Sequence, residues 1–116
     1  MNNEVKSADY RVWHEASTNT VYVEGTLRLA GTEAYQPIQD LMESALSADP
    51  SELILDLKQL EFLNSSGINL LAKFTIFARK KASVPVTVKG SKKIAWQSKS
   101  LPNLQKLYPP LKLEIE

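Results

Sequence analysis

The stretch from residue 53 to residue 72 limits the possible folds of this chain more than any other. It begins with Leu53, Ile54 and Leu55, and an apolar run without polar alternation is typical of a strand buried on both faces. After a polar bend at 58–59, the sequence Asn-Ser-Ser-Gly at 64–67 precedes apolar residues with helical spacing. Serine side chains can accept hydrogen bonds from the free N–H groups of a helix start. We therefore predict a buried central strand at 53–57, a tight connection, and a helix that extends to about residue 81.

The remaining segments predict elements that surround this centre. Alternating apolar and polar residues at 10–14 and 21–28 indicate an antiparallel hairpin. Alternation also predicts strands at 84–88 and 111–115, and Pro102 divides a weaker helical segment at 91–108. One apolar stripe predicts a first helix that starts at residues 31–32. Its regular part should begin near residue 34 or 35, because Pro37 is tolerated only near a helix start. The stripe consists of Ala34, Ile38, Leu41, Met42, Ala45 and Leu46.

Taken in chain order, these elements read β-β-α-β-α-β-α-β. The order predicts an α+β fold in which helices pack on one side of a mixed central sheet of four to five strands. Residues 1–8 are polar and are expected to be loose. A chain of 116 residues has the length of one domain, so we expect a single domain over 1–116.

Composition excludes several classes of function. The net charge of +1 argues against a nucleic-acid binder, which would carry a strong basic excess. The chain has no cysteine, so disulfides and thiolate metal sites are excluded, and we expect no metal and no cofactor. No apolar run approaches the roughly 18 residues that span a bilayer, so no membrane insertion is expected. The first ten residues contain no apolar signal region, and the expected location is therefore cytoplasmic.

The central stretch resembles the STAS family, the fold of the bacterial anti-sigma factor antagonists. The family signature is a strand reading L-x-L-D-L followed, after a short link, by F-[LM]-D-S-[ST]-G-[LI]. One position departs from this signature, since Asn64 stands where the family usually carries Asp. The matching residues are Leu53, Leu55, Asp56, Leu57, Phe62, Leu63, Ser65, Ser66, Gly67 and Ile68.

The resemblance implies a non-enzymatic protein-binding module that is switched by phosphorylation. The first serine of the pair, Ser65, matches the phosphorylation site of the family. A serine kinase that is also an anti-sigma factor would bind the unmodified protein, and a serine phosphatase would reset it. Catalysis and ATP would belong to the kinase, so this chain is expected not to be an enzyme.

The residues around Ser65 are expected to form the partner-binding surface: Asn64, Ser66, Gly67 and Arg28. A phosphate on Ser65 would lie beside free N–H groups and the positive end of the helix dipole. One hydroxyl is enough for a helix cap, so we expect Ser66 to cap the helix and Ser65 to be more accessible. The alternative is that both serines serve only as caps.

Arg28 is a second departure from the family, which often has Gly-x-Leu-Asp after its second strand. In this chain the segment 25–28 ends with arginine. If the loops meet as they do in the family, Arg28 would lie near Ser65 and could hold a phosphate in a bidentate contact. The alternative is a solvated arginine at the end of a strand.

Two other functions stay open. One is a STAS subunit of a transporter or signalling complex that acts by constitutive contact, without phosphorylation. The other is a small ligand-binding domain with its pocket near the helix start. A catalytic Ser-His-Asp group would have to use His14, the single histidine, which is expected far from the serines on the hairpin.

Overall fold

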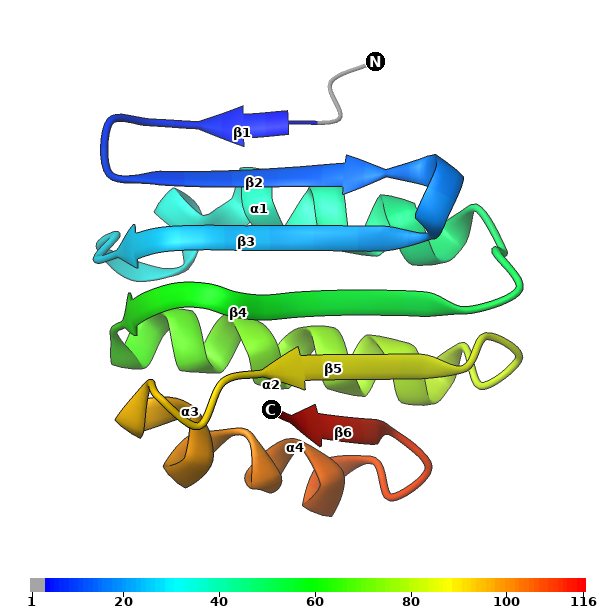
Figure 1. Cartoon of the computed structure of the whole chain (residues 1–116). Coiled ribbons are helices and arrows are strands. Elements are labelled where there is room, and N and C mark those ends of the chain that lie inside the picture. Colours follow the sequence, from blue (N-terminus) through cyan, green and yellow to red (C-terminus); the bar gives the residue numbers. More distant parts are fainter. Residues whose placement is uncertain (1–3) are drawn as a thin grey trace.

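A six-stranded sheet forms the frame of the protein (Figure 1). The computed structural model describes residues 4–116. Strand order across the sheet follows chain order; β1, β2 and β3 pair antiparallel, while β3 to β6 are parallel. The strands are β1 (Glu4–Lys6), β2 (Tyr10–Glu15), β3 (Thr20–Leu27), β4 (Leu53–Leu63), β5 (Val86–Gly90) and β6 (Lys112–Ile115).

The mixed sheet confirms the predicted layout, but the expected count of four to five strands was too low. The additional strand is β1, which lies in the segment expected to be loose. Its residue Val5 pairs with Val12 of β2 and packs against the core, so apolar contact and strand pairing order this short segment. Residues 1–3 lie outside the described part.

The helices cover one face of the sheet, as predicted (Figure 1). They are α1 (Gly31–Ser47), α2 (Ser65–Lys80), α3 (Ala95–Ser100) and α4 (Pro102–Leu107); a short 3-10 turn (Ala16–Thr18) joins β2 to β3. Pro102 separates α3 from α4 and occupies the first turn of α4, where its missing N–H costs nothing.

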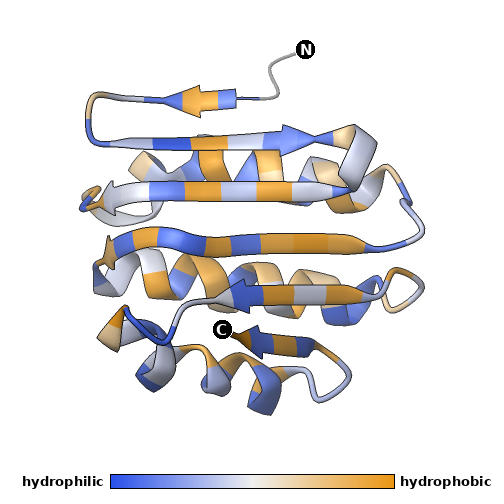
Figure 2. Ribbon diagram, in the orientation of Figure 1, coloured by the Kyte–Doolittle hydropathy of each residue, from blue (hydrophilic) through white to orange (hydrophobic). Residues whose placement is uncertain are grey.

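Strand β4 is buried on one face only, so the expectation of burial on both faces was wrong. Leu53, Leu55 and Leu57 are buried, while Ile54 and Asp56 are half-buried on the opposite face. The apolar run that suggested double burial is visible as the continuous apolar start of β4 (Figure 2). Because all the helices lie on one side, the other face of β4 stays partly open to solvent.

Strand β4 also extends further than predicted, because the polar bend at 58–59 is a bulge within the strand. Tyr22 of β3 pairs with Asp56, but Glu24 pairs with Gln59, so β4 contains an extra residue between these pairs. A second shift follows Gly25. With these two extra residues, the last residue of β4 still pairs with the last residue of β3, Leu63 with Leu27. The serine segment follows directly after this end of β4.

A buried glutamine secures this bulge. The side chain of Gln97 has no exposed surface, and its Nε2 donates to the carbonyl oxygens of Leu57 (2.6 Å) and Leu60 (3.0 Å). Its Oε1 accepts from the backbone N–H of Ser91 at 2.7 Å. Gln97 thus ties α3 to β4 at the point where the strand is irregular, and all its polar atoms have partners.

Helix α1 starts at Gly31, as predicted, but its regular part begins before residue 34. Pro37 lies inside the helix instead of near the start of its regular part. Tyr35 is buried whereas Ala34 is exposed, so Tyr35, Ile38 and Met42 begin the buried stripe. Pro37 is exposed, so its ring points away from the packed side of the helix.

Candidate functional site

The start of α2 is capped by Asn64. This residue has an extended backbone, with φ −81° and ψ 177°, and its Oδ1 accepts from the backbone N–H of Gly67 at 3.0 Å. The same oxygen accepts from the hydroxyl of Tyr35 at 2.7 Å, and Nδ2 donates to the carbonyl of Leu29 at 2.9 Å. One amide therefore joins the end of β4, the first turn of α2, the loop after β3 and helix α1.

The expectation that Ser66 caps the helix was wrong. Asn64 occupies the capping position, whereas Ser65 and Ser66 are the first two helical residues. Ser65 is exposed and Ser66 is half-buried, so the first serine is the more accessible of the two. Because Asn64 satisfies the helix start, the hydroxyl of Ser65 is not needed as a cap.

The departure at Asn64 has a structural reason. An aspartate could accept from Gly67 and Tyr35, but it has no N–H to donate to the carbonyl of Leu29. The side-chain amide provides both an acceptor and a donor. At this position, asparagine rather than aspartate fits the backbone of the preceding loop.

Sequence reasoning missed Tyr35 as a residue of the site. The ring is 2% exposed, and burial raises the pKa of the phenol, so the hydroxyl keeps its proton and donates to Asn64. The signal was present in the sequence. Tyr35, Ile38 and Met42 have the spacing of one helical face.

Gly67 allows the first turn of α2 to pack closely. A Cβ at this position would lie 2.1 Å from Cδ1 of Leu63 and 2.9 Å from the hydroxyl of Tyr35. Gly67 and Leu63 are both buried. Gly67 therefore has a packing role in placing the two serines.

The ends of β3 and β4 bring Arg28 next to the serine segment. Leu27 pairs with Leu63, and the backbone N–H of Asn64 donates to the carbonyl of Leu27 at 3.2 Å. The guanidinium carbon of Arg28 lies 4.8 Å from the ring centroid of Phe62, a cation–π contact. Phe62 is 41% exposed and is the exposed large hydrophobic residue of the described chain. The segment after β3 thus contacts Asn64, the residue before Ser65, and the Arg28 guanidinium rests on the ring of Phe62.

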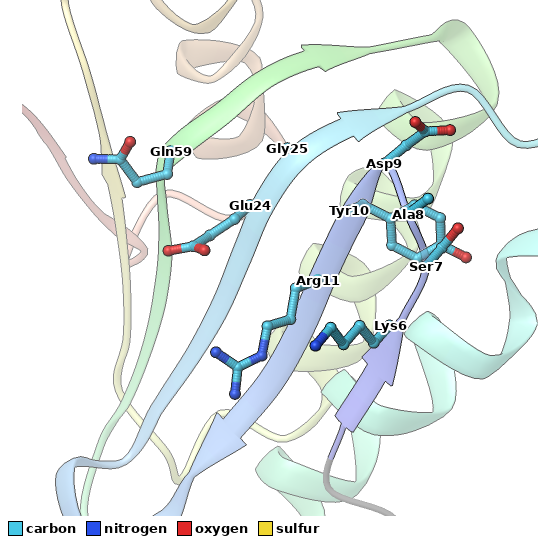
Figure 3. A pocket seen from close by; sticks show the side chains of 9 residues that line it. All are labelled: Lys6, Ser7, Ala8, Asp9, Tyr10, Arg11, Glu24, Gly25 and Gln59. Atoms are coloured by element: carbon cyan, nitrogen blue, oxygen red, sulfur yellow. The ribbon is translucent and has the colours of Figure 1, made fainter.

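The uncovered face of the sheet contains a separate shallow hollow of about 560 Å³ (Figure 3). It mixes both signs of charge and does not reach the serines, in contrast to the expected ligand pocket near the helix start. Its lining residues are Lys6, Ser7, Ala8, Asp9, Tyr10, Arg11, Glu24, Gly25 and Gln59. A neighbouring hollow of about 330 Å³ extends to Arg28 and Leu29.

The uncovered face also carries a stack of side chains. The rings of Trp13 and Tyr22 lie 4.7 Å apart at 18°, and the guanidinium of Arg11 lies 3.9 Å from the Trp13 ring centroid. His14, further along β2, is half-buried, and burial lowers its pKa.

The part of the chain that the structure describes has neither a metal-binding cluster nor a membrane-spanning helix. Residues 4–116 contain no group of three His, Cys, Asp or Glu side chains placed to hold a metal ion. Within the same range, every helix is too short or too polar to cross a bilayer.

The element order, the sheet pairing and the helices on one face define a mixed α/β protein with a STAS-like fold. Among solved structures, the chain is similar to apo-SiaC from Pseudomonas aeruginosa. The two share 14% identity with a TM-score of 0.74, covering 100% of this chain and 99% of that chain. A chain of the Pseudomonas aeruginosa complex of the diguanylate cyclase SiaD with its activator SiaC is also similar. Here the identity is 14% and the TM-score 0.73, covering 99% of this chain and all of that chain.

At this level of identity the likeness is one of fold. No family model matches the sequence, and no curated protein matches it.

Proposed function

We propose that the protein is a non-enzymatic protein-binding module whose binding surface is switched by phosphorylation of Ser65. The observation that carries the proposal is the division of roles at the start of α2. Asn64 caps the helix and Gly67 packs against Leu63, which leaves the exposed Ser65 without a capping role, one residue after the Asn64 that holds the segment carrying Arg28. In this proposal, the partner-binding surface consists of Ser65 together with Asn64, Ser66, Gly67 and Arg28.

The first turn of α2 can accept a phosphate without unfolding. A phosphate at Ser65 would carry about −1.5 to −2 charges next to the positive end of a helix of 16 residues. Transfer would move the γ-phosphoryl group of ATP to Oγ of Ser65, releasing ADP and the hydroxyl proton. The cognate serine kinase would supply ATP and the catalytic base, and a serine phosphatase would reverse the step.

The expected consequence is release of a bound partner. The unmodified surface presents a neutral hydroxyl, and a dianion buried at the same contact without a counter-charge costs several kcal/mol. Each 1.4 kcal/mol corresponds to tenfold in affinity, so phosphorylation should weaken binding by on the order of a hundredfold. In the pathway that the STAS resemblance implies, the partner is the kinase itself, which acts as an anti-sigma factor.

A second candidate is a constitutive contact with a signalling enzyme. The observation that favours it is the fold likeness to SiaC, which is solved in complex with the diguanylate cyclase that it activates. In that case the partner of this chain would be a diguanylate cyclase, and Ser65 would contribute to the contact without being modified. The two candidates differ in whether charge at residue 65 controls binding.

The test uses Ser65→Ala and Ser65→Asp as baits in matched pull-downs, followed by quantitative mass spectrometry. Ser51→Asp is the control, because Ser51 is exposed and precedes β4, at the end of that strand opposite the serine segment. We expect Ser65→Ala to retain a partner that Ser65→Asp loses, with Ser51→Asp behaving as wild type. Equal recovery by both Ser65 variants would reject the switch in favour of constitutive contact.

A direct assay complements the pull-down. The protein is incubated with ATP and candidate serine kinases, and intact mass and peptide mapping locate any modification. Addition of one phosphate group at Ser65, absent in Ser65→Ala and unaffected by Ser66→Ala, is the expected result.

A further inference from the structure

The side chain of Arg28 contacts the aromatic ring of Phe62. The Arg28 side chain is exposed, and among residues 4–116 it forms no ion pair. Its contact is with the ring of Phe62, at 4.8 Å from the centroid. Arg28 is therefore a cation with free N–H donors, resting on an exposed aromatic side chain.

Asn64, the residue before Ser65, holds the backbone on both sides of Arg28. Residues 27 and 29 on either side both accept hydrogen bonds from Asn64, through its backbone N–H at 3.2 Å and its Nδ2 at 2.9 Å. Asn64 precedes Ser65 directly. The segment that carries Arg28 is thus attached at two points to the residue next to Ser65, and the flexible side chain is the part that can move.

We propose that Arg28 exchanges between the ring of Phe62 and a phosphate on Ser65. A bidentate, charge-assisted contact with a phosphate is stronger than an exposed cation–π contact, so the phosphate should take the guanidinium. This inference rests on the proposed modification of Ser65 and names the regulation of that site. Phosphorylation would then change the surface in two ways at once, since it would neutralise Arg28 and uncover Phe62.

The exchange would add a second change to the partner surface besides the charge of the phosphate. In the unmodified protein, a partner meets an aromatic ring under a planar cation, the residue types that are enriched where binding energy concentrates. In the phosphorylated protein, the same partner would meet a bare ring and a phosphate whose charge of about −1.5 to −2 is only partly compensated by Arg28. Arg28 therefore acts as a positioning residue of the phosphorylated loop and as a contact of the free one.

The experiment installs phosphoserine at position 65 during translation, so that its result does not depend on any kinase. A ³¹P NMR titration gives the second pKa of the phosphoserine in the wild-type background and in Arg28→Gln. Phosphoserine titrates near pH 6 when unperturbed. We expect a lower value in the wild-type background, which rises by about half a unit or more in Arg28→Gln. Arg28→Lys should restore only part of the shift, because a lysine lacks the planar fork.

A second readout follows the ring. In the unmodified protein the δ-methylene protons of Arg28 should show a ring-current shift, for which Phe62→Leu gives the zero value. Phosphoserine should abolish that shift. An unchanged phosphoserine pKa in Arg28→Gln, or a ring-current shift that survives phosphorylation, would overturn the exchange. Failure of every kinase to modify Ser65 would instead count against the proposed function and leave this result standing.

Discussion

The hydroxyl of Tyr35 donates a hydrogen bond of 2.7 Å to Oδ1 of Asn64, which joins the second turn of α1 to the cap of α2. The two residues are 29 positions apart in the chain. The same oxygen accepts from Gly67 in the first turn of α2. The position of the serine segment therefore depends on both helices.

The first prediction concerns this cap. Asn64→Ala removes a helix cap and two further hydrogen bonds, so the free energy of unfolding should fall by roughly 2–3 kcal/mol. Tyr35→Phe removes one hydrogen bond and should cost about 1 kcal/mol. Asn64→Asp keeps the acceptor but not the donor to Leu29, and should lie between wild type and Asn64→Ala. Urea denaturation measures all three, and a neutral Asn64→Ala would show that the cap is not needed.

The two serines should have little effect on stability. Because Asn64 provides the cap, Ser66→Ala should cost less than about 0.5 kcal/mol instead of the cap value of about 1. Ser65→Ala should be similarly neutral, since the side chain is exposed. Thermal or urea unfolding of both variants checks this. A loss near 1 kcal/mol in Ser66→Ala alone would return the capping role to that residue.

Gly67→Ala tests the close packing of the first turn. The added methyl group would overlap Leu63 and approach the Tyr35 hydroxyl, and overpacking of this kind costs about 1–3 kcal/mol. The better helix propensity of alanine returns up to about 1 kcal/mol. A net loss of about 1–2 kcal/mol is expected in denaturant unfolding. The double variant Leu63→Ala/Gly67→Ala should lose less than the sum of the two single variants, because the smaller Leu63 position relieves the overlap.

Leu55→Ala probes the buried face of β4. Leu55 is 1% exposed in a central strand, so its truncation should cost roughly 2–5 kcal/mol through the lost burial and the cavity. The matched control is Ile54→Ala on the uncovered face, where the side chain is half-buried. Its loss should be clearly smaller, and equal losses would contradict the one-sided covering of the sheet.

His14 should make stability depend on pH. Burial lowers its pKa below the unfolded value of 6.5, so the unfolded chain binds more protons between these two values. Stability should therefore be highest above pH 6.5 and fall as the pH is lowered through the folded pKa. Unfolding titrations of wild type and His14→Gln between pH 5 and 8 measure the difference. Parallel curves would show that His14 does not contribute.

Local patterns predicted most of the elements. The hairpin at 10–28, the stripe along the first helix and the division at Pro102 follow from spacing and from the backbone limits of proline. The helix start after β4 was also predictable, because a short polar tetrapeptide separated two apolar segments. These features depend on neighbours in the chain, which a sequence displays directly.

The details of the site depend on partners distant in the chain. Choosing between Asn64 and Ser66 as the cap required the contacts with Tyr35 and Leu29, which are 29 and 35 positions away. The bulge in β4 looked like the end of a strand, because only Gln97, about 40 positions later, shows how its carbonyl groups are satisfied. The half-open face of β4 was also not predictable from neighbouring residues. Ile54 lies in an apolar run, although no helix covers its side of the strand.

The sequential order of the strands divides the molecule into two contiguous parts, a longer one with β1 to β4 and a shorter one with β5 and β6. A cut in the turn between α2 and β5 would leave β1 to β4 with α1 and α2 in one fragment, and everything after the turn in the other. The sheet would then need to rejoin along a single seam, the four residue pairs between β4 and β5. Ser65 and Arg28 would both lie in the first fragment. The chain is therefore suited to a split reporter, in which reassembly of two separately expressed pieces restores the sheet without interrupting the serine segment.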